Sequence, residues 1–245
     1  MVYLEEHGIY YKTIKKELEV WQKQITRPPS IINKLSKGVQ TKVQHLIPQK
    51  AQDIITAAIK TMVETVISGS ILLTNSKHDV AVNPTLSESD FLVERAFNTY
   101  YKLAIAQGVG FGLAGFLINL ADLPALLTVK VKFLFDAAKL YGFDVNHKIE
   151  RIFMLYVFQL AYCCDRRRLE IFPIIQNWET LSEQLEVDWE QLQIEYRDYM
   201  DISKLLQLLP VVGAVAGASA NHSLMKKLKV TTMNCYRLRF INKMN

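Results

Sequence analysis

Four polar residues lie in or beside the most apolar parts of the sequence, and their types could support chemistry: Asn119, Asp122, Lys130 and Asn221. If the fold brings them together, an acid, a lysine and two amides would line the pocket of an enzyme. If they lie apart, each is an ordinary cap or structural group. Nothing in the sequence names a reaction for such a pocket, so both alternatives stay open.

Asp122 and Lys130 are the two charged members of this set. Asp122 precedes Leu123-Pro124 and is predicted to cap a helix, a role worth about 1 kcal/mol. Contact with a ligand or a cation is the alternative for this acid. Helical phase places Lys130 among apolar residues, where it must snorkel outward, find an acid or bind an anion such as a lipid phosphate. By the same phase Lys132 pairs with Asp136 on the surface.

Several common catalytic and metal-binding patterns are missing from the sequence. The five histidines form neither H-x-x-x-H nor H-E-x-x-H, and Cys163-Cys164 lacks the spacing of a zinc site. No G-x-S-x-G elbow or Walker loop occurs. We therefore predict no catalytic residue, no metal ligand and no cofactor.

Two segments, 103–129 and 205–220, are too apolar for a surface helix. A membrane-spanning helix needs about 20 predominantly apolar residues. The second segment is shorter than that, and the first is interrupted by Gln107, Asn119 and Asp122. Since an acid near the centre of a span is costly, we do not expect either segment to cross a membrane.

Each apolar segment contains a G-x-x-x-G spacing, Gly108/Gly112 in the first and Gly213/Gly217 in the second. Two glycines one helical turn apart form a flat strip against which another backbone packs closely. Glycine destabilises a helix interior by about 1 kcal/mol relative to alanine, so this packing, or a ligand, must compensate. The segments predict either a close helix crossing at the centre of a bundle or a hydrophobic element that meets lipid.

Residues 110–115 match G-x-G-x-x-G, the pattern of dinucleotide-binding loops. Such a loop needs a strand before it and an acid about 20 residues after it. Here the preceding residues are predicted to be helical, so the required strand is missing. We therefore reject a dinucleotide site.

The helical elements can be placed from periodicity and caps. The first helix is predicted from about Leu4 to Gln24, and a later one from Pro48 to Ile71, followed by a polar loop over 74–86. Ser87, with Asp90 three residues later, is predicted to cap the next helix.

The second half of the chain is also predicted to be helical. Tyr141-Gly142 ends one helix through a glycine cap, and Asp144 begins the next, which reaches Tyr162. Arg166–Arg168 and Pro173 are predicted to mark a connection. The last helix follows Pro210 and ends near Ile241.

Charge is unevenly distributed along this chain of net charge +5. Residues 1–60 contain 10 Lys and Arg against 5 acids, and residues 221–245 contain six basic residues and no acid. Between Glu179 and Asp201 there are eight acids and one arginine. Basic ends of this kind either dock internally on acids or contact an anionic surface. We expect no nucleic-acid binding, which would need a higher charge and interleaved aromatic residues.

The quoted motifs resemble those of the EcsC family over nearly the whole chain. The resemblance rests on 110–115 with the following phenylalanine, on 121–124, on 141–144 and on Leu46-Ile47-Pro48-Gln49-Lys50. It continues in Pro210, Gly213, Gly217 and Asn221, and ends at Tyr236, Arg237 and Arg239. This bacterial family is named for a gene beside those of an ABC transporter, which implies a membrane transporter as a partner. The resemblance implies no activity and no catalytic residue.

Together these observations predict an all-α, multi-helix bundle with two glycine-rich apolar helices packed at its centre. We expect one domain over 1–245, with N-terminal helices over 1–73, a loop over 74–86 and core helices over 87–245. The N-terminal residues do not resemble a signal peptide, so a cytoplasmic protein is expected, peripheral at the inner membrane face. The function expected is that of a non-enzymatic accessory protein binding anionic lipid or a hydrophobic ligand. Its candidate binding residues are Gly108, Gly112, Asn119, Asp122, Lys130, Gly213, Gly217 and Asn221.

Overall fold

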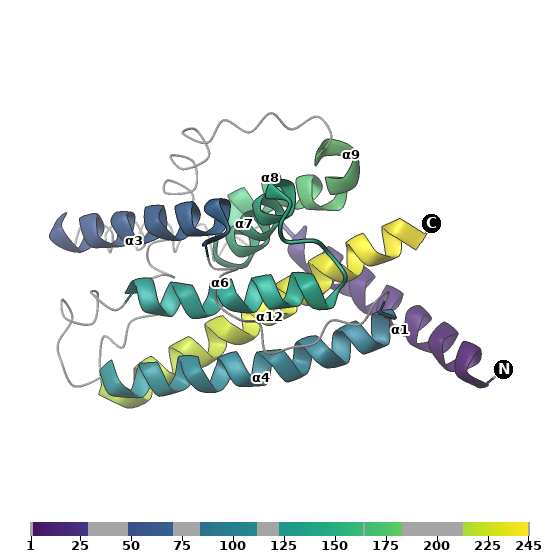
Figure 1. The fold of residues 1–245 in the computed structure, drawn as a ribbon, viewed down its shortest axis with the longest axis horizontal. Helices are drawn as coiled ribbons and strands as arrows, with labels where there is room; N and C mark the ends of the chain where they lie inside the picture. The colour runs from purple at the N-terminus through teal and green to yellow at the C-terminus, as the bar shows by residue number, and fades with distance from the viewer. Residues whose placement is uncertain are drawn as a thin grey trace.

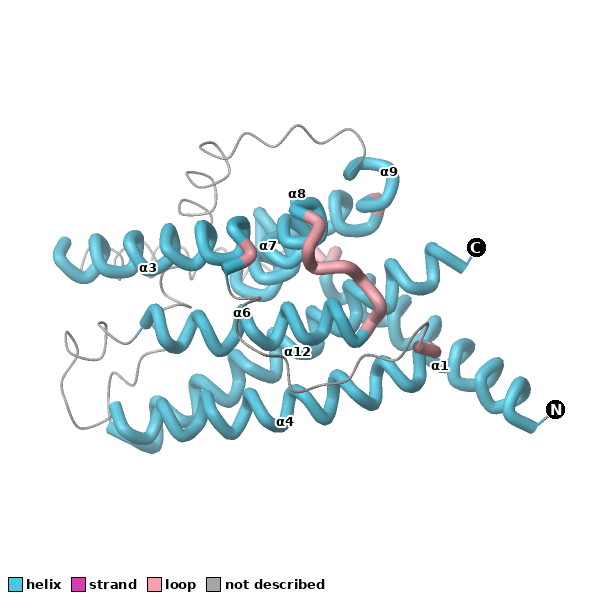
Figure 2. Tube along the Cα trace, viewed as in Figure 1, coloured by secondary structure: helices cyan, strands magenta, loops and turns pink. Residues whose placement is uncertain are grey.

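The computed structural model describes residues 2–28, 49–70, 84–111, 123–163, 165–182 and 213–244. Every secondary-structure element in these ranges is an α-helix, which confirms the predicted all-α class (Figure 1, Figure 2). The helices are α1 (Val2–Ile25), α3 (Gln49–Ser68), α4 (Leu86–Phe111), α6 (Leu123–Leu140), α7 (Lys148–Tyr162), α8 (Asp165–Gln176), α9 (Trp178–Ser182) and α12 (Gly213–Met244). Within the described ranges, none is both long and apolar enough to cross a bilayer.

The longest helix, α12, contacts α1, α4, α6, α7 and α8. It runs antiparallel to α4, and α6 packs against this pair (Figure 1). Helix α3 packs on α6 and α7. Helix α8 packs on α7, and the short helix α9 contacts α8. Helix α1 crosses α12 near its C-terminal end, so that both chain termini lie at the same end of the molecule (Figure 1). The C-terminal half of α12 is thus the meeting point of several helices.

Buried aromatic rings hold that half of α12 in place. Phe133 on α6, Phe153 on α7 and Tyr236 on α12 are fully buried. The Phe153 ring centre lies 5.1 Å from that of Trp178 and 5.2 Å from that of Tyr236. Because burying one such side chain contributes about 1.5–3 kcal/mol, these rings fix the register of α12 against α7 and α9.

Helix α4 begins with a capping box formed by Thr85 and Glu88. The Thr85 amide donates to Glu88 Oε2 at 2.8 Å, and the Glu88 amide donates to Thr85 Oγ1 at 3.3 Å. The prediction that Ser87 caps this helix was therefore wrong by two residues. Asp90, the expected partner of that cap, is buried and bonded to other helices.

The turn between α6 and α7 confirms one predicted cap and corrects another. Gly142 has a φ of +80°, and the amides of Gly142 and Phe143 donate to the carbonyls of Lys139 and Ala138. This is the glycine cap that the sequence predicts. Asp144 does not begin α7: its carboxylate accepts the amide of Asn146 at 2.9 Å and closes a turn before the helix starts at Lys148.

The expected connection at Arg166–Arg168 and Pro173 was wrong, because these residues lie inside α8. Ion pairs one turn apart support the helix here. Arg168 lies 3.1 Å from Asp165, and Glu170 accepts from both Arg166 and Arg167. A run of three arginines that looks like a linker is thus part of a helix, where two acids pair with all three.

Candidate functional site

Three polar residues near the end of α12 reach out to other helices. Tyr236 and Arg239 are three residues apart, so they share one face of the helix, while Arg237 points to another. Tyr236 and Arg239 both bond Glu150 of α7, whereas Arg237 bonds Asp90 of α4. The two faces produce two separate polar clusters.

The first, the Asp90 cluster, joins α4 to α1 and α12. Arg237 Nε donates to both carboxylate oxygens of Asp90, at 3.1 and 3.0 Å, and Tyr10 donates its hydroxyl at 2.6 Å. Tyr141 donates a further hydroxyl, and Arg237 also lies 3.4 Å from Glu17 of α1. Burial and the Asp90 carboxylate raise the pKa of Tyr10 and of Tyr141, so both hydroxyls remain protonated donors.

The second, the Glu150 cluster, joins α12 to α7 and α9. Arg239 Nη1 lies 2.9 and 2.7 Å from the two oxygens of Glu150, and its Nε lies 2.7 Å from Glu179. Tyr236 donates its hydroxyl to Glu150 at 2.9 Å. The Arg239 guanidinium also stacks 4.0 Å from the ring centre of Phe143. Burial raises the pKa of Glu150, and the charge of Arg239 opposes that rise.

Both clusters are structural rather than catalytic. Each carboxylate is buried and held by an arginine and by tyrosine hydroxyls, which leaves it poorly placed to exchange a proton with a substrate. The rings of Tyr141 and Tyr236 stack at 5.5 Å and link the two clusters. The clusters therefore set the positions of α1, α4, α7 and α9 around α12.

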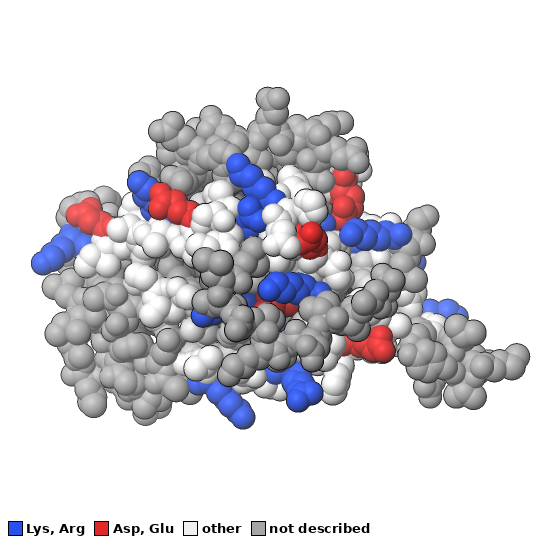
Figure 3. Space-filling model, viewed as in Figure 1, with Lys and Arg blue, Asp and Glu red and all other residues white. Residues whose placement is uncertain are grey.

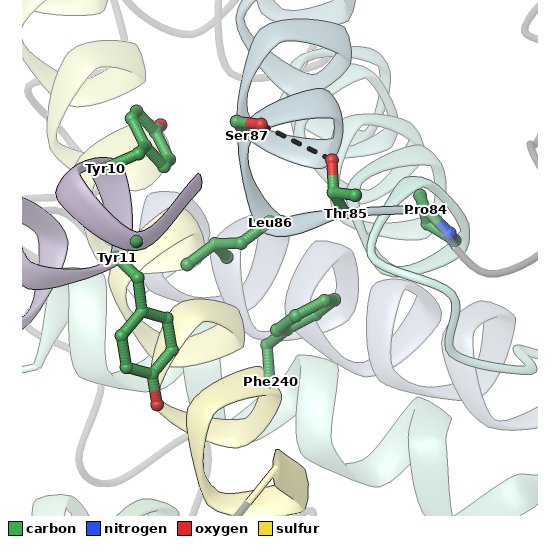
Figure 4. Close-up of a pocket in the computed structure, with 8 residues that line it drawn as sticks. Tyr10, Tyr11, Pro84, Thr85, Leu86, Ser87 and Phe240 are labelled. Carbon is green, nitrogen blue, oxygen red and sulfur yellow. Dashed lines mark hydrogen bonds between the residues drawn. The ribbon is translucent and has the colours of Figure 1, made fainter. Parts of the chain in front are cut away.

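Next to the Asp90 cluster lies a groove with a volume of about 500 Å³ and an almost entirely apolar lining. Three parts of the chain form it: Gly8, Tyr10 and Tyr11 of α1, residues 84–87 at the start of α4, and Phe240 of α12. Figure 4 shows Leu86 and Phe240 between the two tyrosines and Pro84, with Thr85 and Ser87 bonded at one side. The Tyr10 hydroxyl is bonded to Asp90, so Tyr10 contributes only its ring to the groove.

The outer side of the α4–α12 pair is a second feature, which we call the basic face. On α4, Phe91, Arg95, Asn98 and Lys102 are exposed at i, i+4, i+7 and i+11, and therefore form one stripe. On α12, Ser223, Lys226, Lys227 and Val230 are exposed at i, i+3, i+4 and i+7. Both stripes point away from the core, where α6 packs. In Figure 3, blue side chains project from the lower edge of the molecule, along which α4 runs.

The basic face has little negative charge to balance it. Helix α12 contains no acid, and Glu94 of α4 is taken by Lys229 at 2.7 Å. Within the described residues, no acid pairs with Arg95, Lys102 or Lys226. Phe91 is 66% exposed, which is unusual for such a large apolar side chain. This surface thus combines an exposed aromatic ring with Arg95, Lys102 and Lys226, three cations for which the described residues supply no acidic partner.

Comparison with known proteins agrees with the resemblance found in the sequence. The family model described as "EcsC protein family" matches residues 12–241. The chain belongs to the EcsC family. It is 42% identical over 228 residues to "Protein EcsC" of Bacillus subtilis (strain 168), covering 93% of this chain and 95% of the relative. It is 30% identical over 217 residues to "Uncharacterized protein YdbA" of the same organism, covering 86% of this chain and 76% of the relative. No solved structure matches.

In this EcsC-family protein, most residues of the predicted site fall outside what the structure describes. Gly112, Asn119 and Asp122 lie outside the described residues. Gly108 lies in α4, and Gly213, Gly217 and Asn221 lie in the first turns of α12, where only the helical backbone is described. The predicted pocket and the predicted glycine-packed crossing therefore stay predictions. The described part of α6 starts at Leu123, directly after Asp122, so the predicted cap at Asp122 also stays a prediction.

Lys130 is the one predicted site residue whose side chain is described. It is 0% exposed, which rules out outward snorkelling, one of the three alternatives that the sequence left open, and does not decide between an acid and an anion. Burial lowers the pKa of its amine to about 7. The predicted surface pair of Lys132 with Asp136 was also wrong, because Asp136 is buried and accepts the Tyr100 hydroxyl at 2.6 Å.

The groove was missed entirely at the level of sequence. Its three parts are separated by more than 70 residues along the chain at each step, so no local spacing links them. The one available signal was Gly8, a glycine inside a predicted helix. Tyr236, Arg237 and Arg239 were noted only as part of the family resemblance.

Proposed function

We propose that this EcsC-family protein is a non-enzymatic accessory protein of the inner membrane face, where its basic face binds anionic lipid. The observation that supports this proposal is the exposure of Phe91, Arg95 and Lys102 along one stripe of α4 and of Lys226 on the neighbouring helix α12. A bilayer surface rich in anionic lipid offers the complementary charge, and its interface accepts an aromatic ring.

The expected strength can be estimated from these side chains. Each lysine or arginine near an anionic surface contributes about 1 kcal/mol. Partial burial of Phe91 adds at most about 1.5–3 kcal/mol. Three cations and one ring therefore support reversible, salt-sensitive attachment. Lys130, which the sequence also offered for this role, cannot contribute because it is buried.

Co-sedimentation with vesicles at low salt tests this proposal. Vesicles of phosphatidylcholine with 30% phosphatidylglycerol, about a third anionic lipid, are compared with pure phosphatidylcholine. The triple variant Arg95→Gln, Lys102→Gln, Lys226→Gln should bind the anionic vesicles about 100-fold more weakly. Phe91→Ser should weaken binding to them further.

A matched control removes the same charge elsewhere. Lys50, Lys60 and Lys148 are exposed on α3 and α7, and replacing all three by Gln should leave binding nearly unchanged. If the control triple loses as much affinity as the basic-face triple, overall charge and not this face is responsible. If the unaltered protein does not sediment with anionic vesicles, the proposal fails.

A membrane transporter as partner, which the family resemblance implies, is an alternative occupant of the same face. Vesicles that lack protein discriminate between the two. Binding to native membranes but not to pure lipid vesicles would favour a protein partner over anionic lipid.

A further inference from the structure

We propose that the groove between α1, α4 and α12 binds one acyl chain that carries an anionic head group, such as a long-chain fatty acid. This site is separate from the basic face and does not depend on the proposed membrane binding. Its position beside the Asp90 cluster keeps the three contributing elements fixed relative to one another.

The size of the groove matches a single chain. Its volume of about 500 Å³ lies within the range of known ligand sites. A methylene occupies a volume similar to that of a water molecule, roughly 30 Å³, so the groove holds on the order of fifteen carbons. A second chain of that length would not fit within it.

The lining of the groove suits a hydrocarbon. Tyrosine rings, Pro84, Leu86 and Phe240 surround it from different elements (Figure 4). Three of the four hydroxyl groups in the lining are already engaged: Thr85 and Ser87 bond each other, and Tyr10 bonds Asp90. Because these groups have partners, an apolar chain can enter without leaving them unsatisfied.

Gly8 keeps the groove open. It lines the groove from inside α1, and a Cβ added there would meet no atom of the described residues within 4 Å. Glycine weakens a helix interior relative to alanine, and neither packing nor a left-handed backbone explains this glycine. A larger side chain at this position would project into the space that we assign to the acyl chain.

A cation for the head group lies beside the groove. Lys15 is exposed, and its Nζ lies 5.3 Å from the ring centre of Tyr11, one of the lining residues. No described acid forms an ion pair with Lys15, whereas Glu17 and Glu88 are engaged by Arg237 and Thr85. A carboxylate or a phosphate at the end of the chain would therefore find an available positive charge.

Equilibrium dialysis with labelled palmitate tests the site directly, and two further probes identify the head group. Palmitate and lysophosphatidylglycerol carry one chain and one negative charge, whereas hexadecanol carries the chain alone. We expect both anions to bind. If only lysophosphatidylglycerol binds, the ligand is a monoacyl phospholipid, and if only palmitate binds, it is a free fatty acid.

Two variants of Gly8 separate filling of the groove from effects on the helix. Gly8→Leu should weaken binding at least tenfold because it occupies the groove. Gly8→Ala should change binding by less than about threefold, although both variants favour the helix. Thermal unfolding should show equal or higher stability for both, so lost binding cannot be attributed to misfolding.

A charge variant tests the head group. Lys15→Gln should weaken palmitate binding about two- to fivefold, as expected for an exposed ion pair, and leave hexadecanol unaffected. Lys23→Gln on the same helix is the matched control and should change neither.

The proposal is overturned if none of the three probes binds, or if Gly8→Leu binds palmitate as tightly as the unaltered protein. Failure here is distinct from failure of the proposed function. Gly8→Leu should still sediment with anionic vesicles, and the basic-face triple variant should still bind palmitate.

Discussion

Replacing Lys130 by Met should stabilise the protein and remove part of its pH dependence. Lys130 is fully buried on α6, and burial lowers its pKa from 10.5 to about 7. The unfolded chain therefore binds more protons than the folded one between pH 7 and 10.5. Since stability rises with pH wherever the unfolded state binds more protons, the unaltered protein should become more stable across this window.

The size of the effect follows from the shift. The pKa of the Lys130 amine is about 7 in the folded protein and about 10.5 in the unfolded chain. Its burial therefore lowers the free energy of unfolding by about 4 kcal/mol at pH 7 and by about 2 kcal/mol at pH 9. The protein should thus gain about 2 kcal/mol between these two pH values. Methionine has a similar volume and no charge, so Lys130→Met should remove the cost of burying the amine at pH 7, less whatever the amine's own contact contributes, and show no such rise.

Urea unfolding at pH 6, 7, 8 and 9 measures both quantities. The range stops at pH 9 because Tyr10, Tyr100 and Tyr162 have raised pKa values, so folding disfavours their ionisation and lowers stability at higher pH. Lys132→Met is the matched control: this neighbouring lysine is only partly buried, so its loss should leave the rise with pH intact.

Parallel pH profiles for Lys130→Met and the unaltered protein would refute this reasoning. They would show that Lys130 keeps its proton in the fold through a counter-charge, despite its burial. A destabilised Lys130→Met would point the same way, because breaking a buried ion pair costs more than burying a methionine.

Two further substitutions test the contacts that position α12 and α7. Glu150→Gln should destabilise the protein by about 3 kcal/mol or more in urea unfolding, because Arg239 loses its buried counter-charge; a loss below about 1 kcal/mol would mean that Glu179 alone suffices for this arginine. Gly142→Ala should cost about 1–2 kcal/mol and lower the melting temperature by several degrees, since its φ of +80° strains any Cβ-bearing residue; an unchanged melting temperature would contradict that account.

Features encoded by a few neighbouring residues could be predicted from the sequence. The end of α6 at Tyr141-Gly142 was predicted because a glycine cap involves only adjacent residues. The start of α4 was misplaced by two residues because Thr85 and Ser87 are both good caps, and only the bonds to Glu88 decide between them. The prediction that Asp144 begins α7 was wrong for a similar reason, since an aspartate side chain can either close a turn or cap a helix.

Features that depend on distant contacts could not be predicted. Arg237 and Asp90 are 147 residues apart, and Arg239 and Glu150 are 89 apart, so no spacing connects them. Lys130 shows the limit of helical phase in another way. The helical periodicity of the sequence correctly placed Lys130 on an apolar face. Whether its amine reaches water depends on the packing around α6, which the periodicity does not give.

The six basic residues of segment 221–245 look alike in the sequence, but the structure separates those that pair with acids from those that are exposed. Of its six basic residues, Arg237 and Arg239 dock internally on acids, and Lys229 pairs with Glu94. Arg239 reaches Glu179, the first acid of the acidic stretch, as internal docking requires. Internal docking, one of the two alternatives that the sequence left open, is therefore present in this helix, whereas contact with an anionic surface stays a proposal. Internal docking uses the arginines toward the end of α12, whereas Lys226, in its middle, remains exposed for an anionic surface. An argument for membrane binding must count only such exposed cations, since a buried, paired arginine adds nothing to attraction at the surface.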